Sequence, residues 1–390
     1  MNGQTAGTAS AAVFDPRLAM RARHPGLDLL RALAIVLVVL YHAGLFGFVL
    51  PFRMERFGWI GVDLFFVLSG YLIAGQLLSP LAAGKRLDIA QFYARRALRI
   101  LPAFLAIVAI YVFLPQLREY PRMPPVWKFL TFTQNLGLRG GTAFSHAWSL
   151  CIEGQFYLLL PFVVMALARF RRGHLAIPCG IVLGGVILRA LLAQRISSSP
   201  HPSFGEWQQL IYYPTYARLD PLTIGVSLAA IERFRPDWWS TLMKSARWIW
   251  APGIAAIVVA LILAEDGLNV PSSTFDFPLI AFGVATMLVT AVSPELPFSR
   301  IPLPGAAFLA TIAYSIYLSH KLVIHALQNA CSALSVPLIS WRCYLCMLAA
   351  ILLAGSVLFF AIERPFLLLR QRYVRRQRAA GLHRANAARS

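Results

Sequence analysis

Residues 27–50, LDLLRALAIVLVVLYHAGLFGFVL, form the stretch that most constrains what this chain can fold into. The run is apolar and long enough to cross a bilayer, which takes about 20 such residues. It nevertheless holds Asp28, Arg31 and His42, and helical periodicity places all three on one face. At about 1.5 Å of rise per residue, His42 lies roughly 16 Å deeper than Arg31. Ionisable groups inside a membrane span are costly and mark a functional site by default, so this helix is expected to form one wall of a polar shaft.

The rest of the sequence repeats the apolar pattern in long blocks. The chain is 58% hydrophobic and 13% charged, whereas a soluble protein carries roughly 25% charged residues. Apolar blocks of about 20 residues predict an all-α, polytopic membrane helical bundle with about ten transmembrane helices. The segment 126–138 is too short and polar to cross, and we expect an interfacial or re-entrant helix there. The predicted spans are 27–50, 57–79, 97–115, 148–168, 175–192, 208–230, 246–264, 275–292, 305–326 and 340–366.

The formal net charge of +20 is spread between the apolar blocks and the C-terminal tail. With the N-terminus in the cytoplasm, the inside segments carry about three times as many Lys and Arg as the outside segments, as the positive-inside rule expects. Both termini are therefore predicted to be cytoplasmic, in a multi-pass protein of the cytoplasmic (inner) membrane, and nucleic-acid binding is not expected. Residues 1–24 are expected to be a disordered basic leader, 25–369 one membrane domain, and 370–390 a basic tail that contacts anionic lipid.

Arginines gather at the predicted cytoplasmic level of two spans. Arg96 and Arg99, three positions apart, share a helix face, and Arg99 already lies inside an apolar run. Arg31 lies one turn into its own span. From charge alone, plain positive-inside anchoring is the favoured interpretation, and the depth of Arg99 and Arg31 within their spans counts against it. Guanidinium groups that face a shaft would instead bind phosphates, which they can contact through two hydrogen bonds at once.

A second set of polar residues falls in the predicted outer half of the spans: His42, Asp63, Glu153 and His320. Histidine can act as a general base or form a transient acyl-imidazole. A carboxylate beside it would set its tautomer and stabilise the charged ring. A single membrane histidine often makes only a hydrogen bond between helices, and this alternative stays open for His320 in particular.

Other polar residues within spans have simpler interpretations. Arg218 and Asp220 are two positions apart and do not face each other on a helix, so structural pairing elsewhere is the favoured interpretation. The five cysteines are scattered, mostly within apolar blocks. Cys343 and Cys346 form a C-x-x-C without any redox-domain pattern, and no disulfide framework is inferred. No metal site is expected.

Cations at the cytoplasmic mouth and an imidazole deeper in the shaft would suit a long donor with phosphates at one end. Coenzyme A thioesters have this shape, although composition only permits such a donor and does not establish it. At these residues the sequence resembles the membrane acyltransferase-3 family, bacterial O-acyltransferases that modify surface polysaccharides, lipopolysaccharide, nodulation factors and some antibiotics. The resemblance covers about residues 24–370 and is carried by six fragments in order, namely LDLLRALAIVLVVLYH, GVDLFFVLSGYLI, FYARRALRILP, AWSLCIEGQFYLLLP, YSIYLSHKLVI and IERPF.

The resemblance implies acyl-CoA, commonly acetyl-CoA, as the donor. It implies that His42 is the essential catalytic residue and that Arg31, Arg96 and Arg99 bind the donor. The acceptor would be a glycan or glycolipid that is exported or displayed at the cell surface. Some relatives carry an additional periplasmic esterase-like domain, and the expectation for this chain is a stand-alone form with direct delivery or a separate partner protein.

The sequence departs from the family pattern in its fourth-span motif. Where relatives have paired glutamates, this chain has Glu153 and Gly154. The carboxylate role beside His42 is therefore assigned to Glu153, with Asp63 and then Asp28 as the other candidates. The acceptor, the acyl chain length and the oligomeric state are not predicted.

Two other classes of protein compete with an acyltransferase. A transporter or flippase for an anion or a lipid-linked saccharide would also have about ten spans and buried charges, but the sequence shows no inverted pattern of Gly/Pro-broken helices in its two halves. A structural assembly subunit would leave Arg31 and His42 unexplained.

Overall fold

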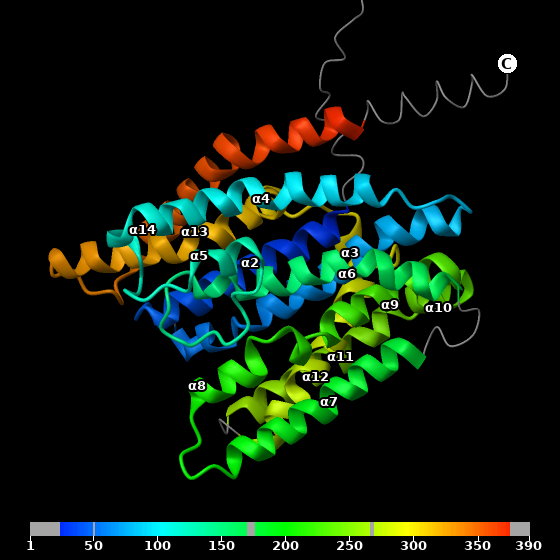
Figure 1. Cartoon of the computed structure of the whole chain (residues 1–390), viewed down its shortest axis with the longest axis horizontal. Coiled ribbons are helices and arrows are strands. Elements are labelled where there is room, and N and C mark those ends of the chain that lie inside the picture. The colour runs from blue at the N-terminus through cyan, green and yellow to red at the C-terminus, as the bar shows by residue number, and fades with distance from the viewer. Residues whose placement is uncertain (1–23, 50, 170–175, 266–268, 375–390) are drawn as a thin grey trace, which may run out of the picture.

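The computed structural model describes residues 24–49, 51–169, 176–265 and 269–374, and within them the chain is helical and contains no strand (Figure 1). The expected all-α polytopic bundle is confirmed. Residues 1–23 of the expected leader and most of the expected tail lie outside the described residues. The longer helices are α2 (Pro25–Leu45), α3 (Ile60–Ala82), α4 (Ile89–Phe113), α6 (Trp148–Arg169), α7 (Ala176–Ser197), α9 (Asp220–Phe234), α11 (Ala246–Glu265), α12 (Val270–Val292), α13 (Ala306–Ala333) and α14 (Trp341–Leu358). The shorter ones are α5 (Val126–Leu130), α8 (Phe204–Trp207) and α10 (Pro236–Lys244). The 3₁₀ turns are η1 (Pro51–Phe57), η2 (Pro115–Leu117), η3 (Ser145–Ala147), η5 (Thr215–Ala217) and η6 (Pro297–Ser299), and the π turns are η4 (Gln208–Tyr212) and η7 (Phe359–Glu363). After η7 the chain stays helical to the end of the described residues, so α14, η7 and this stretch form one span, Trp341–Val374.

Nine helices within the described residues are long and apolar enough to cross a membrane. The predicted span 208–230 is not a continuous helix: the chain passes through η4, breaks at Pro214 and resumes as the 15-residue α9. Proline at 214 and 221 accounts for the break, because proline favours the first turn of a helix and not its interior. The segment 126–138 forms only the short α5 followed by turns, in keeping with its predicted inability to cross.

Helix α2 lies between two parts of the apolar core. It begins with Pro25 in its first turn, where the missing N–H costs nothing. Ile35 and Val38 belong to one cluster of buried side chains, whereas Leu30 and Ala34 belong to the other. The helix packs against α3, α12 and α13. The stretch that dominates the sequence is therefore central in the structure.

Helices α3 and α9 approach each other closely through two glycines. A Cβ atom on Gly70 would lie 2.3 Å from Leu222 O, and one on Gly225 would lie 2.2 Å from Val67 O. Either contact is far inside a normal van der Waals separation, so each position requires glycine. This packing places the interrupted segment α9 inside the bundle even though it is too short to span a membrane alone.

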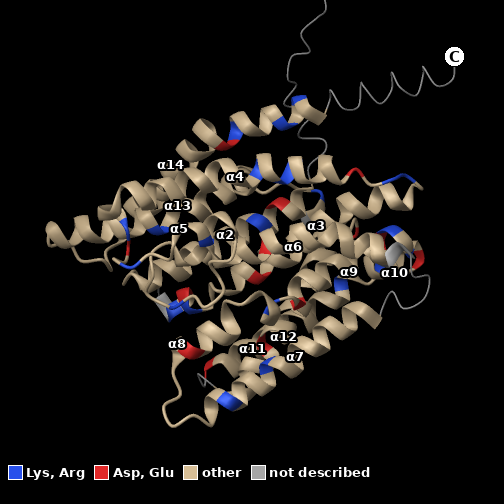
Figure 2. Cartoon of the chain, in the orientation of Figure 1, with Lys and Arg blue, Asp and Glu red and all other residues tan. Residues whose placement is uncertain are grey.

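Helices α7 and α11 form the outer surface of the bundle. Leu183, Leu191 and Ile262 on these helices are each about 60% exposed, which suits contact with lipid chains. Figure 2 shows that the long helices carry few charges along their length, while charged residues gather between α3 and α4 and around α10. This distribution is the one a bilayer imposes, since charges are tolerated at its surfaces and are costly within it.

Candidate active site

Two pockets lie along one side of α2, and they meet at a shared wall. The inner pocket has a volume of about 610 Å³ and reaches from His24 to Tyr317. The outer pocket has a volume of about 210 Å³ and contains His42. Val62 and Tyr317 line both. His24 and Arg370 both line the inner pocket, so the start of α2 and the C-terminal part of the span Trp341–Val374 lie at the same end of the bundle.

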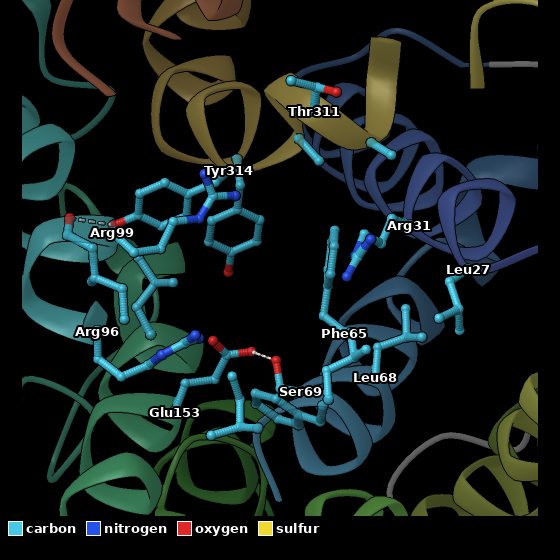
Figure 3. Close-up of a pocket in the computed structure, with 18 of the residues that line it drawn as sticks. Leu27, Arg31, Phe65, Leu68, Ser69, Arg96, Arg99, Glu153, Thr311 and Tyr314 are labelled. Atoms are coloured by element: carbon cyan, nitrogen blue, oxygen red, sulfur yellow. Dashed lines mark hydrogen bonds between the residues drawn. The ribbon is translucent and has the colours of Figure 1, made fainter. Parts of the chain in front are cut away.

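The inner pocket gathers the three arginines expected to bind a donor. Arg31 comes from α2, and Arg96 and Arg99 come from α4; all three line this pocket (Figure 3). The same cavity is also lined by Arg370, by the carboxylates of Asp28 and Glu153, and by apolar and aromatic side chains, so four guanidinium groups face two carboxylates. This excess of positive charge suits an anion with an apolar or extended part. The predicted convergence is present in the structure.

The partners of the two α4 arginines differ. Arg96 donates to Gln76 Oε1 at 3.0 Å and lies over the ring of Tyr157. Arg99 forms an ion pair with the buried carboxylate of Glu363, whose other oxygen accepts from Ser315 Oγ at 2.6 Å. Glu363 belongs to η7, the π turn that contains the start of the IERPF motif. Arg99 therefore also holds η7, which follows α14, against α4. Arg96 makes no ion pair within the described residues.

Glu153 lies in the inner pocket beside Arg96 (Figure 3). It accepts hydrogen bonds from Ser69 Oγ and from Tyr157 Oη, each at 2.7 Å. These neutral donors from α3 and α6 fix the orientation of the carboxylate without neutralising it. The carboxylate and the nearby guanidinium face the same cavity.

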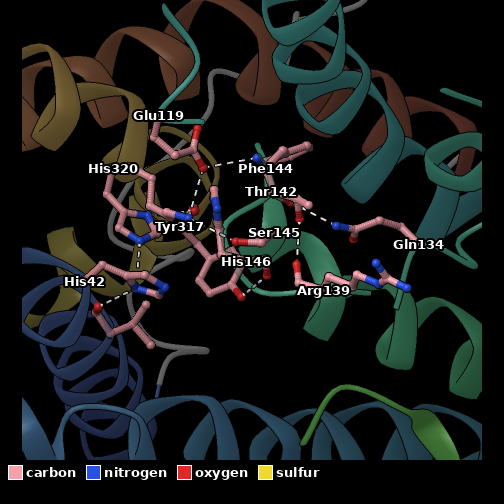
Figure 4. Close-up of polar contacts among 12 residues, drawn as sticks. His42, Glu119, Gln134, Arg139, Thr142, Phe144, Ser145, His146, Tyr317 and His320 are labelled. Carbon is pink, nitrogen blue, oxygen red and sulfur yellow. Dashed lines mark hydrogen bonds and ion pairs between the residues drawn. The ribbon is translucent and has the colours of Figure 1, made fainter. Parts of the chain in front are cut away.

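The outer pocket is built around imidazole rings. His42 Nδ1 lies 2.9 Å from Val38 O and 3.2 Å from His320 Nε2 (Figure 4). The third ring, His146, precedes α6 in η3 and lies 5.9 Å from the ring of His42 and 4.9 Å from that of His320, centroid to centroid. His146 is buried, and neither of its ring nitrogens has a hydrogen-bond partner among the described residues.

A buried ion pair borders these rings. Lys321 Nζ lies 2.9 Å from Glu119 Oε1 and donates to Ser145 Oγ at 3.1 Å. The same Glu119 oxygen accepts from the backbone N–H of Phe144 at 3.1 Å (Figure 4). The pair therefore connects α13 to the loops on both sides of α5, and it holds the loop that carries His146.

Aromatic side chains form much of the remaining outer pocket: Tyr41, Trp59, Tyr120, Trp148, Tyr212 and Tyr213. Flat aromatic faces beside hydroxyl and amide groups suit the apolar faces of a sugar ring. Tyr120 lies in the loop after α4, outside the spans. Burial, and then the neighbouring Glu119 carboxylate, raise the pKa of Tyr120 above its ordinary value, so this phenol keeps its proton.

None of the three predicted carboxylates contacts His42. Glu153 faces the inner pocket. Asp28 forms an ion pair with Arg31 at 3.2 Å, also in the inner pocket. Asp63 is fully buried and pairs with Arg218 at 2.8 Å. The expected juxtaposition of an acid with His42 is therefore absent, and the residue that takes its place is His320.

Two residues of the site, Tyr317 and His146, were not predicted from the sequence. Tyr317 belongs to the quoted YSIYLSHKLVI fragment and falls one turn before His320, but an unpaired tyrosine in an apolar run carries no distinctive signal. His146 stands just before AWSLCIEGQFYLLLP in a loop, where no helical periodicity assigns it a face. No group of three or more His, Cys, Asp or Glu among the described residues is placed to hold a metal ion.

The fold and the site define a multi-pass membrane protein in which a cationic pocket and an imidazole-lined pocket share a wall. The family model described as an acyltransferase domain matches residues 24–361. The chain belongs to this acyltransferase-3 family, which confirms the resemblance read from the sequence motifs.

Curated relatives share the same membrane region. The O-acetyltransferase OatA of Staphylococcus aureus is 27% identical over 321 residues, which cover 77% of this chain and 50% of the relative. The peptidoglycan O-acetyltransferase OatA of Listeria monocytogenes is 28% identical over 362 residues, which cover 87% of this chain and 55% of the relative. The chain thus spans about half the length of these relatives. No solved structure matches the chain.

Proposed function

We propose that this protein transfers an acyl group, in the first instance acetyl, from acyl-CoA to a hydroxyl of a glycan. The observation that carries the proposal is the arrangement of the two pockets: four arginines, the three predicted ones and Arg370, line one, His42 lines the other, and Val62 and Tyr317 line both. A donor with its phosphates near the arginines would extend its thioester toward the wall. The acceptor hydroxyl would enter from the aromatic outer pocket.

The arginines would contribute in different ways. Arg31 on α2 and Arg96 on α4 line the inner pocket from opposite sides (Figure 3), so the several phosphates of CoA would be bound from both sides. Arg99 is committed to Glu363, and its remaining N–H groups would add to the positive field. Arginine is suited to this role because its planar group makes two parallel hydrogen bonds to one phosphate.

His42 would supply the chemistry at the wall. As a general base, its ring takes the proton of the acceptor hydroxyl while the oxygen attacks the thioester carbonyl. The C–S bond breaks, a C–O ester bond forms, and the departing thiolate receives the proton from His42. If the ring attacks first, an acyl-imidazole forms with release of the thiol, and the acceptor oxygen then displaces the imidazole. Either route consumes one thioester and produces one ester and free CoA.

The acceptor proposal rests on the outer pocket and on the relatives. About 210 Å³ bounded by Trp59, Trp148 and several tyrosines has room for little more than one sugar ring. Relatives that carry the same membrane region are described as O-acetyltransferases, one of them for peptidoglycan. A cell-wall or other exported glycan is therefore the proposed acceptor, with the protein in the cytoplasmic membrane and the inner pocket open to the cytoplasm.

The test is acyl transfer by the full chain reconstituted in lipid vesicles. Acetyl-CoA with a labelled acetyl group is supplied on one side, and soluble peptidoglycan disaccharides or other surface-glycan fragments serve as acceptors, with products read by mass spectrometry. We expect labelled ester on the glycan and an equal amount of free CoA. His42→Ala should abolish the product, while His201→Ala, at an exposed loop position that lines neither pocket, should not.

Two results would count against the proposal. Undiminished transfer by His42→Ala would remove the proposed chemistry. Movement of a saccharide across the vesicle without acetyl-CoA, combined with no ester product, would favour a transporter instead.

A further inference from the structure

We propose that His320 is a positioning residue that fixes the tautomer of His42, in the place where a carboxylate would be expected. The inference rests on the proposed function, because it concerns how the reacting ring is held. His320 lies on α13 and is fully buried, and its Nε2 atom lies 3.2 Å from His42 Nδ1. Two imidazole rings from helices α2 and α13 thus meet directly at the outer pocket (Figure 4).

The proton positions follow from what surrounds His320. Its Nδ1 atom lies 3.1 Å from Ile316 O and 2.8 Å from Tyr317 O. Carbonyl oxygens only accept hydrogen bonds, so His320 Nδ1 must carry the proton and donate. In a neutral ring the other nitrogen, Nε2, then has a free lone pair and acts as an acceptor.

The same reasoning then applies to His42. Its Nδ1 atom lies 2.9 Å from Val38 O and 3.2 Å from His320 Nε2. Both neighbours are acceptors, so His42 Nδ1 carries the proton and shares it between them. The opposite nitrogen of His42, Nε2, keeps its lone pair and is free to take a proton or attack an acyl carbon. A free neutral histidine side chain prefers the reverse tautomer, so the two acceptors impose the one that the chemistry needs.

A neutral partner suits this part of the bundle. The nearby cation, Lys321, is already paired with Glu119, so an added carboxylate beside His42 would leave an uncompensated negative charge in a buried site. When His42 takes the acceptor proton on Nε2, its Nδ1–H becomes a charged donor, and its hydrogen bond to His320 Nε2 strengthens. The proton then leaves from Nε2 to the departing thiolate, while His320 keeps its own proton throughout.

Two substitutions separate this role from mere packing. The amide of His320→Asn falls at the level of the imidazole Nδ1, where it can donate to Ile316 O or Tyr317 O but cannot reach His42. The longer His320→Gln places its amide near the level of Nε2, within reach of His42. We expect kcat to fall at least about tenfold in the Asn variant. This is less than the roughly 10²–10⁴-fold contribution of general acid–base catalysis, because His320 acts only through His42. Most of the rate should return in the Gln variant, with the donor KM unchanged in both. Equal kcat in the two variants would overturn the proposal.

A second measurement reads the tautomer without any turnover. Nitrogen-15 solid-state NMR of histidine-labelled protein in lipid distinguishes protonated from bare ring nitrogens, and the His42 signals are those lost in His42→Ala. We expect Nδ1–H with bare Nε2 in the wild-type protein, retained in His320→Gln and shifted toward Nε2–H in His320→Asn. Nε2–H in the wild type, or an unchanged ratio in His320→Asn, would overturn the role of His320. Because no acyl transfer is needed, this result is independent of whether the proposed function holds.

A separate contact leads us to infer a disulfide between Cys331 and Cys343. Their Sγ atoms lie 3.1 Å apart, closer than two unbonded sulfurs ordinarily pack, and both side chains are buried. Cys331 lies in the last turn of α13 and Cys343 in the first turn of α14. The C-x-x-C spacing of the sequence is misleading here, because Cys346 is exposed and the neighbour of Cys343 is Cys331.

The bond would fix the end of the α13–α14 hairpin that holds the segment after His42. Gln328 Nε2 on α13 donates to Phe46 O at 3.1 Å, and the Tyr344 hydroxyl on α14 donates to Val49 O. In the predicted topology this end faces the oxidising side of the membrane. Formation removes two electrons and two protons from the thiols; an oxidised dithiol carrier on that side would accept them through a mixed disulfide.

The test is peptide mass spectrometry on protein extracted from membranes, denatured and alkylated before any reduction. We expect a Cys331–Cys343 linked peptide that disappears on reduction, with Cys179 and Cys346 alkylated from the start. Cys331→Ser should lower the thermal unfolding midpoint, whereas the matched Cys346→Ser on the exposed side of α14 should leave it unchanged. Alkylation of both Cys331 and Cys343 before reduction would overturn the inference.

Discussion

Tyr317 Oη lies 2.6 Å from Ser149 Oγ, and this hydrogen bond joins α13 to α6 within the wall between the two pockets. The tyrosine hydroxyl also donates to His146 O at 2.7 Å, so Ser149 is the donor in the first bond. Phe65 packs edge-on against the same ring. The Tyr317 side chain is therefore held from three directions, between the pocket proposed for the donor and the pocket proposed for the acceptor. Its loss should have consequences different from those of substitutions within either pocket.

Tyr317 variants should uncouple donor cleavage from acceptor acylation. Tyr317→Phe keeps the ring and loses only its hydrogen bonds, so we expect transfer to continue within a few-fold of wild type. Tyr317→Ala should join the pockets and admit water to the thioester, since a closed site protects reactive groups from hydrolysis. Free CoA should then exceed acylated glycan, as measured by thiol release and mass spectrometry on one reaction. The same ratio in both variants would show that the ring does not act as a barrier.

We expect Arg96 to act only in donor binding, and Arg99 to act in both donor binding and the stability of the fold. Arg96→Gln should raise the donor KM with little change in the melting temperature in detergent, because Arg96 makes no ion pair among the described residues. Arg99→Gln would leave the buried Glu363 carboxylate without its cation and should destabilise the protein by about 2 kcal/mol, less than a fully buried pair because Arg99 is partly exposed.

The control for this prediction is Arg99→Gln combined with Glu363→Gln. Removing the carboxylate together with its partner should restore most of the lost stability without restoring donor affinity. Equal KM effects and equal melting temperatures for the two single variants would contradict the division of roles.

Asp63 should behave as a structural residue. Its carboxylate and the Arg218 guanidinium are both fully buried and lie 2.8 Å apart, and Arg218 also lies 3.7 Å from the centre of the Phe277 ring. Asp63→Asn leaves a buried cation without its partner and should cost about 3–5 kcal/mol of stability. Thermal unfolding in detergent measures this. A stable Asp63→Asn protein with abolished kcat would instead assign Asp63 to the chemistry.

The arginine cluster could be predicted from the sequence because membrane burial makes each polar residue in an apolar run informative. Arg31, Arg96 and Arg99 stood at one depth, and depth was sufficient to bring them to one pocket. The partner of His42 could not be obtained this way. The predicted depth in the membrane is similar for Glu153 and His320. Which pocket each side chain faces depends on the rotation of α6 and α13 about their axes, and packing between the helices sets that rotation.

The interrupted span shows a second limit. The average hydropathy of residues 208–230 predicts a continuous helix. An average of this kind does not include the contacts that a charged residue makes with another helix. Arg189 on α7 donates to Asp220 at 2.5 Å and to Ala217 O at 2.8 Å, which satisfies the groups exposed where the helix breaks. A buried guanidinium from another helix thus stabilises an irregular turn at membrane depth, and no local sequence signal connects the two.

Gly154, where the family pattern considered in the sequence analysis has a second glutamate, lies against the ring of Phe132. A Cβ atom at position 154 would lie 2.8 Å from Phe132 Cδ1, and that ring cannot move aside easily because it stacks on Phe104 at 5.0 Å. Gln155 Nε2 also donates to Phe132 O, which fixes the backbone beneath the ring. Gly154→Glu should therefore destabilise the protein by about 1–3 kcal/mol through overpacking, and Gly154→Ala should show part of the same loss. Adding Phe132→Ala to Gly154→Glu should recover part of the loss. Thermal unfolding of the wild type, Gly154→Glu, Phe132→Ala and the double variant measures the coupling. Strict additivity of the two substitutions would show that the ring does not limit this position.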